Sequence, residues 1–149
     1  MLTEKNILSI AKDALRHFKL DCEIRFMDHK KFLETAKKSP IIAQALEEGT
    51  DFDELKIPAL IHHSEKEHIY LCKKILNGLL EHLPIKMEKA FMKSVLYHEL
   101  FHIVYEHEVE KADFNDCMKS EKRVCDAFKV RYPKLHKIGY EIHKKATKL

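Results

Sequence analysis

Glycine and proline are scarce in this sequence, which contains three Gly and four Pro among 149 residues. Because these residues mark turns and the ends of elements, their scarcity predicts a mostly helical protein with few tight turns. Hydrophobic residues make up 45% of the chain and charged residues 34%, a balance typical of globular rather than disordered proteins. This length suits one sizeable core, so we expect a single domain over residues 1–149.

Long apolar runs and paired cysteines are also missing. No segment approaches the ~18 apolar residues of a membrane-spanning helix, and the N-terminus leads into a charged amphipathic segment rather than a signal peptide. The four cysteines form no Cys-x-x-Cys pair and no disulfide-scaffold spacing. We therefore expect a cytoplasmic protein without a membrane partner.

The sequence also has only a small excess of positive charge. The net charge of +3 does not by itself indicate a nucleic-acid partner. Residues 129–149 hold seven Lys or Arg and one Glu, but a solvated helix face explains this pattern more simply than a binding surface. We expect no nucleic-acid partner, and the sequence selects no oligomeric state.

The most informative stretch is the His-Glu-x-x-His pattern of His98, Glu99 and His102. Residues i and i+4 share one face of an α-helix, so both imidazoles can bind one metal ion. Glu99 is offset by about 100° around the helix, which suits a general base acting on a water at that metal. Chance would place this pattern about 0.08 times in a chain with 11 His and 16 Glu, so alone it is a moderate signal.

The surroundings of the motif strengthen this interpretation. Bulky uncharged residues fill the other positions from 95 to 104: Val95, Leu96, Tyr97, Leu100, Phe101, Ile103 and Val104. A helix that is apolar nearly all round is a buried helix. Three ionisable side chains there are costly unless something binds or pairs them, and Zn²⁺ is the partner that we expect.

The remaining patterns predict helices and a few strands. Apolar periodicity and capping residues predict helices over 4–19, 28–38, 41–48 and 134–148. A long helix should run from 85 to 106 or beyond, and another should begin at the cap Asn115-Asp116 and end before Pro133. Alternation predicts strands over 22–27, 57–63 and 68–72, the last two joined by a short turn, while 73–82 is a short helix or a loop. This order predicts an α+β fold in which a small β-sheet packs on the motif helix, with further helices at both ends.

A catalytic zinc site has three protein ligands and one open position, so a third ligand is needed. Glu121 is the strongest candidate because it lies on the apolar face of its helix, in line with Met118, Val124, Cys125 and Phe128. A carboxylate on that face needs a buried partner, which a metal would provide. The opposite face carries Lys122, Arg123, Asp126 and Lys129.

Four other residues compete for the third position. His107 lies about 140° round the helix from His102, so it can join only if the helix breaks. Glu106 is on the right side but a full turn further along the axis, where an ion pair with a lysine is simpler. Asp113 and Asp116 are further candidates, although Asp116 is more simply a helix cap.

With these residues the chain resembles a zincin metallopeptidase of the gluzincin type. That family has His-Glu-x-x-His on one helix and a glutamate ligand on a following helix, a pattern that His98, Glu99, His102 and Glu121 match. The resemblance covers residues 57 to 130. In length the chain is similar to the minigluzincins and to ImmA/IrrE-like metallopeptidases. It implies a minimal zincin-like domain that hydrolyses a peptide or protein with Zn²⁺, Glu99 acting as the base.

Two positions depart from the family pattern. Cys125 stands four residues after Glu121, where gluzincins often carry an acidic or amide residue that orients the first histidine. Phe101 stands where a glycine often precedes the second histidine. An oxyanion stabiliser is also expected, and the sequence does not select one of the C-terminal candidates Tyr132, His136, Tyr140 and His143.

Two other functions fit parts of the sequence. Helical di-iron carboxylate proteins use Glu-x-x-His on two helices, and this spacing occurs at Glu99–His102 and at Glu65–His68. His98 would then have no role. A latent or catalytically silent zincin-like binding module would keep the fold, but a purely structural metal site needs no base at Glu99.

Overall fold

Eight helices and three strands make up the part of the chain described by the computed structural model, namely residues 2–63, 67–81, 83–108 and 117–148. Within these ranges, only the backbone is described for residues 40–41, 60–63, 67, 106–108, 117–121 and 148. The elements are α1 (Glu4–Phe18), β1 (Glu23–Met27), α2 (His29–Ala36), α3 (Pro40–Glu47), α4 (Phe52–Leu55), β2 (Ala59–His63), β3 (Glu67–Cys72), α5 (Lys73–Leu80), α6 (Ile85–Glu108), α7 (Cys117–Arg131) and α8 (Pro133–Lys148).

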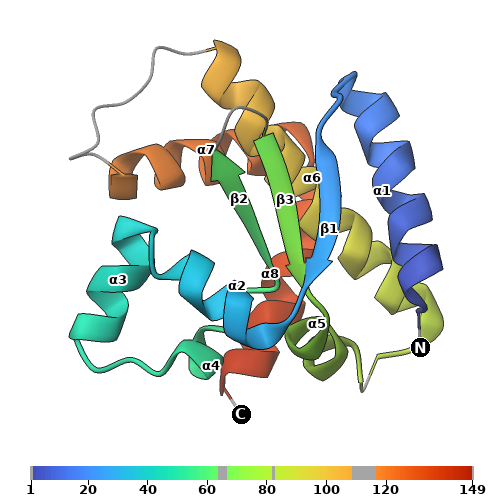
Figure 1. The fold of residues 1–149 in the computed structure, drawn as a ribbon. Helices are drawn as coiled ribbons and strands as arrows, with labels where there is room; N and C mark the ends of the chain where they lie inside the picture. The colour runs from blue at the N-terminus through green and yellow to red at the C-terminus, as the bar shows by residue number, and fades with distance from the viewer. Residues whose placement is uncertain (1, 64–66, 82, 109–116, 149) are drawn as a thin grey trace.

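The fold is mostly helical and of the α+β class, as predicted (Figure 1). The predicted helices and strands are confirmed to within a few residues, and residues 73–80 form a helix. The one-turn helix α4 was not predicted. The proposed cap at Asn115-Asp116 lies outside the described residues.

Local capping explains where the first helices begin. The Thr3 hydroxyl accepts a hydrogen bond from the backbone N–H of Asn6 at 3.1 Å, and the Asn6 side chain accepts one from the Thr3 N–H at 3.1 Å. Asp28 caps α2 in the same way, accepting from the N–H of Lys31 at 2.9 Å. Both caps satisfy amide groups that the first helical turn leaves without intrahelical partners.

The sheet has the strand order β1-β3-β2, so β3 is its central strand. Strands β2 and β3 pair antiparallel, which confirms the predicted hairpin. Along β3, Ile69 and Leu71 are fully buried while Tyr70 between them is half-buried, the alternation of a strand with one face on the core. Strand β1 pairs parallel with β3, which needs a long crossover that local sequence patterns do not reveal.

Helix α6 is the centre of the fold and contacts α1, α7, α8 and β2 (Figure 1). No side chain from Ser94 to Tyr105 is exposed. Four of these side chains are fully buried: Leu96, Leu100, Phe101 and Ile103. The prediction of a helix buried nearly all round is therefore confirmed over the motif. None of the described helices combines the length and apolarity needed to cross a membrane.

The start of α6 holds a buried carboxylate that the sequence did not single out. Glu88 is 3% exposed, and its carboxylate accepts a hydrogen bond from the backbone N–H of Leu2 at 3.1 Å. A negative charge in the first turn of a helix also interacts favourably with the helix dipole. Glu88 therefore ties the N-terminal segment to the beginning of the motif helix.

A close approach between α6 and α8 fixes the relative position of these helices. Ser94 is 4% exposed, and its hydroxyl donates a hydrogen bond to the backbone carbonyl of Leu135 at 2.7 Å. Gly139 faces Ser94, where a Cβ atom would meet the serine hydroxyl below van der Waals contact. Because Ser94 lies one turn before His98, this contact brings the first half of α8 beside the motif.

We predict that Gly139→Ala destabilises the protein because the added methyl group displaces the Ser94 hydroxyl from its carbonyl partner. Gly78→Ala is a matched control, since a Cβ at this position in α5 has no atom within 4 Å. The control should gain about 0.5–1 kcal/mol from helix propensity, whereas Gly139→Ala should be less stable than the control by about 1–3 kcal/mol. Chemical denaturation of the two variants measures this difference, and equal stabilities would refute the close-approach argument.

Candidate metal centre

The two motif histidines lie together on one face of α6. Their Nε2 atoms are 3.0 Å apart, and their ring centroids are 4.8 Å apart with the ring planes at 64°. His102 is 9% exposed and His98 is half-buried. The structure thus brings these two predicted ligands together, with the same ring nitrogen of each directed towards the other.

The distance between the Nε2 atoms is compatible with two interactions. Two imidazoles on one tetrahedral zinc ion, with Zn–N bonds of about 2.05 Å, have nitrogens about 3.3 Å apart. A direct N–H···N hydrogen bond gives about 3.0 Å and requires the two rings to be different tautomers. Because these distances differ by only a few tenths of an ångström, the pair can accept a metal with little rearrangement.

Helix α7 packs over the histidine pair. The Phe128 side chain is 1% exposed, and its ring centroid lies 5.0 Å from that of His98 in an edge-to-face arrangement. The Cys125 Sγ atom lies 3.9 Å from Nε2 of His98. Burial of Val124 and Phe128 confirms the predicted apolar face of α7, and the predicted outer-face residues are all exposed: Lys122, Arg123, Asp126 and Lys129.

Position 121 belongs to α7 and precedes Cys125 by one helical turn. The Glu121 side chain lies outside the described residues, as do Asp113 and Asp116 entirely, so their roles as ligands stay predictions. Among the side chains that the structure describes, no group of three or more His, Cys, Asp or Glu is already arranged to hold a metal ion. The described part of the centre is therefore a histidine pair beside a cysteine.

Helix α6 continues to Glu108 and therefore includes the candidate ligand position His107. In a continuous helix His107 stays about 140° round the axis from His102. The break that would let it join the pair is not present. Glu99, the predicted base, follows His98 directly and is half-buried.

Two of the polar C-terminal candidates hydrogen-bond to partners outside the pair, and a third is exposed. The Tyr132 hydroxyl is hydrogen-bonded to Nε2 of His17 at 2.8 Å. Nε2 of His143 donates to the backbone carbonyl of Leu55 at 3.0 Å. Tyr140 is 57% exposed. None of these contacts directs a hydroxyl or ring nitrogen towards the motif.

His136 is the remaining candidate, and it lies close enough to the pair to interact with it electrostatically. Its ring centroid is 6.5 Å from that of Phe128, the residue that packs on His98. Burial lowers the pKa of His136, and the positive charge of Lys129 and the neighbouring His98 lower it further, while Asp126 opposes them. His136 is therefore held towards its neutral form, which can still donate one hydrogen bond.

Aromatic rings close the other side of the motif helix. Tyr97, which precedes His98, stacks on the His17 ring at 5.0 Å and meets the Tyr132 ring edge-on at 5.7 Å. Burial raises the pKa of both tyrosines, so both keep their protons at neutral pH. This cluster joins α1 to the corner between α7 and α8 and shields the back of the motif from water.

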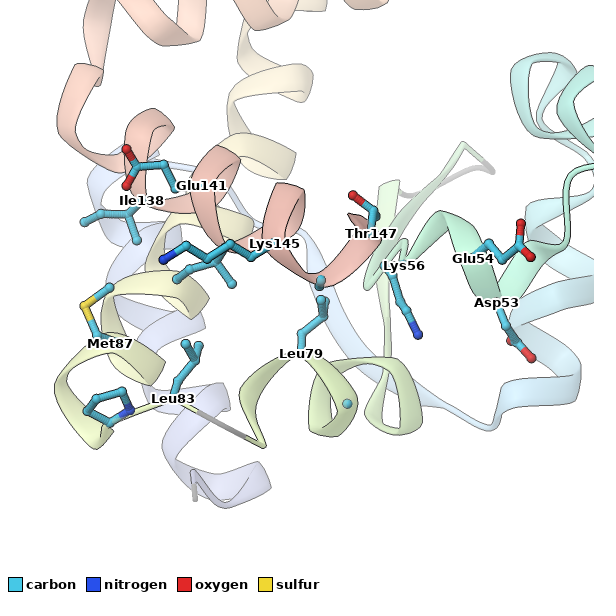
Figure 2. A pocket seen from close by; sticks show the side chains of 14 residues that line it. Asp53, Glu54, Lys56, Leu79, Leu83, Met87, Ile138, Glu141, Lys145 and Thr147 are labelled. Atoms are coloured by element: carbon cyan, nitrogen blue, oxygen red, sulfur yellow. The ribbon is translucent and has the colours of Figure 1, made fainter. Parts of the chain in front are cut away.

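A hollow of about 790 Å³ opens elsewhere, between α4, α5, the start of α6 and α8 (Figure 2). Leu79, Leu83 and Met87 line its apolar part. Met87 precedes His98 by 11 residues on α6, which corresponds to about 16 Å along the helix axis. The hollow has the size of a ligand pocket, but it is not part of the candidate metal centre.

The sequence placed one of the two additional residues on a defined helix face and named the other only as one of four C-terminal candidates. Helical periodicity places Cys125 on the apolar face of α7, although it does not reveal that this face meets His98. His136 gave no such signal, because its proximity depends on the contact between Ser94 and α8.

We predict that the His136 ring titrates below its ordinary value of 6.5 in the metal-free protein. Folding then favours the neutral ring, so its contribution to stability is present above pH 6.5 and is lost as the pH falls below that value. Lys129→Gln should raise the midpoint by removing a positive charge, and Asp126→Asn should lower it. NMR titration of the ring protons measures all three midpoints, and a wild-type midpoint at or above 6.5 would contradict the expectation.

Comparison with known proteins adds no relative: no protein-family model, no curated protein and no solved structure matches this chain. The function must therefore be argued from the residues of the candidate metal centre.

Proposed function

We propose that this chain is a zinc-dependent metallopeptidase with a minimal zincin-like domain of the gluzincin type, acting on a peptide or protein. The observation that carries the proposal is the convergence of the His98 and His102 Nε2 atoms to 3.0 Å. In the proposed centre these two nitrogens hold Zn²⁺ together with the carboxylate of Glu121. Glu99 is the general base.

The burial of the pair supports a metal over an accidental arrangement. The motif lies in residues 94–105 of α6, where no side chain is exposed and polar groups need partners. A hydrogen bond between His98 and His102 would satisfy two ring nitrogens but would give Glu99 no role. A hydrolytic zinc site uses all three side chains, because it needs both ligands and a base.

The position of α7 supports Glu121 as the third ligand. Cys125 and Phe128 place this helix directly against His98. Position 121 is one turn before Cys125, and helical periodicity puts residues 121, 125 and 128 on one side of the helix. A carboxylate there completes a ligand set of two histidines and one glutamate, which is a known composition for catalytic zinc.

The chemistry then divides between the ion and the chain. When bound, zinc would supply Lewis acidity that polarises a water and the peptide carbonyl. Glu99 accepts the proton lost by the attacking water and returns it to the amine nitrogen as the peptide C–N bond breaks. As the donor to the developing oxyanion we propose His136, whose ring centroid lies 6.5 Å from that of Phe128, the residue that packs on His98.

The structure weakens the di-iron alternative. Its second Glu-x-x-His pattern should lie on a helix, but His68 lies in the central strand β3. A silent or latent zincin-like module shares the metal centre with the proposed enzyme and differs only in whether Glu99 supports cleavage.

We predict that zinc stabilises the protein through the histidine pair. At a free zinc concentration 100 times Kd, the free energy of unfolding should rise by about 2.7 kcal/mol. His98→Gln should lose this gain, and Glu121→Ala should lose most of it. His29→Gln is the control, since His29 pairs with Asp53 at 2.8 Å and lies outside the centre. Thermal unfolding with and without zinc gives the result, and equal stabilisation of His98→Gln would exclude this site.

We predict that Glu99→Gln keeps zinc and loses cleavage. Removing the base should lower kcat by about 10²–10⁴-fold, with the zinc content unchanged at one ion per chain. Glu81→Gln, an exposed substitution directly after α5, is the control and should retain full activity. Digestion of a peptide library followed by mass spectrometry provides the substrate and the rate. Undiminished cleavage by Glu99→Gln would sink the mechanism, whereas zinc binding without cleavage by the wild type would favour the silent module.

A further inference from the structure

The Cys125 thiol lies beside the histidine pair. Its Sγ atom lies 3.9 Å from Nε2 of His98, the nitrogen that also faces His102 at 3.0 Å. The Cys125 side chain is half-buried and forms no disulfide. In the gluzincin pattern this position orients the first histidine through an acidic or amide side chain. A thiol is a poor substitute for that role, because sulfur is a weak hydrogen-bond acceptor.

The distance from the Cys125 sulfur to Nε2 of His98 is close to that between a sulfur and a nitrogen on one metal ion, although the three side chains are not yet arranged as a metal-holding group. Tetrahedral zinc with a Zn–S bond of about 2.3 Å and a Zn–N bond of about 2.05 Å separates sulfur and nitrogen by about 3.6 Å. The observed 3.9 Å differs by a few tenths of an ångström. The side chains of Cys125 and His98 can close this difference by small torsional changes, because neither is fully enclosed.

The helices also present their donors in matching pairs. His98 and His102 are an i, i+4 pair on α6, and residues 121 and 125 are an i, i+4 pair on α7. Residues with this spacing lie one above the other on a helix face. Two such pairs on helices that contact each other can supply four ligands to one ion.

We propose that the Cys125 thiolate is a ligand of the metal held by His98 and His102. This inference rests on the metal centre of the proposed function and extends its ligand set. On binding, the thiol transfers its proton to solvent and the sulfur forms a bond to the ion, without oxidation or reduction. A thiolate makes the site prefer thiophilic ions such as zinc over manganese or magnesium.

The extra ligand has a consequence for reactivity. Two histidines, Glu121 and Cys125 together fill the four positions of tetrahedral zinc, whereas hydrolysis needs one open position. Cys125 would then compete with a water for the fourth position of the ion. In this way the cysteine would limit the reactivity of the site that the histidines and Glu99 build.

The test uses the full chain loaded with Co²⁺ in place of zinc. Cobalt bound by a thiolate shows a sulfur-to-metal charge-transfer band in the near ultraviolet, which nitrogen and oxygen ligands do not produce. The wild type and the control Cys22→Ser should show this band; Cys22 is also half-buried and lies outside the centre. Cys125→Ser should still bind cobalt but lose the band, and its zinc affinity should fall by at least about tenfold.

Alkylation of the wild-type protein gives a second measurement that needs no variant. Zinc should slow the reaction of Cys125 with iodoacetamide on the order of tenfold or more, because the metal-bound sulfur is a weaker nucleophile, and a chelator should restore the rate. Peptide mapping should show the reaction of Cys22 unchanged.

The outcomes separate the two proposals. Cobalt binding without a charge-transfer band, a band that survives Cys125→Ser, or alkylation of Cys125 unaffected by zinc would overturn the cysteine ligand and leave the histidine centre standing. Failure of the wild type to bind either ion would overturn both.

Discussion

The structure depends on the burial of two imidazoles and a carboxylate on its central helix. From Ser94 to Tyr105 every side chain of α6 is at least half-buried, and His102 is only 9% exposed. Polar groups removed from water are costly without partners, so the neighbouring helices must bring partners to this segment. Helix α7 brings the Cys125 thiol and the edge of the Phe128 ring against His98.

Small residues and one hydrogen bond decide how closely the neighbours approach. Gly139 lets α8 pack onto α6, and the Ser94 hydroxyl fixes the contact through the Leu135 carbonyl. That contact is one turn from His98, so the position of α8 determines which of its side chains come near the candidate centre. On the other side, stacking of His17 on Tyr97 joins α1 to the motif helix. The candidate centre is thus enclosed by helices from both ends of the chain.

The proposed ligand set joins a catalytic composition with an additional sulfur. Two histidines and a glutamate leave zinc one open position, which hydrolysis requires. A cysteine on the same face of α7 as the glutamate can take that position. The proposed ligand set would therefore provide both a centre for hydrolysis and a state in which its open position is filled.

The sequence by itself determined the local elements and the chemistry of the motif. Helical periodicity located α6 and α7, Thr3 and Asp28 marked the starts of α1 and α2, and the i, i+4 spacing put His98 and His102 on one face. These features depend on residues close together in the chain, so periodicity and capping can reveal them.

The rest of the structure depends on contacts between residues that are distant in the chain. Only the tertiary structure decided that β1 pairs parallel with β3, that α8 approaches α6 at Ser94, that Cys125 lies beside His98 and that His136 lies near Phe128. No local pattern encodes such contacts, because they follow from the packing of whole helices and strands around one core.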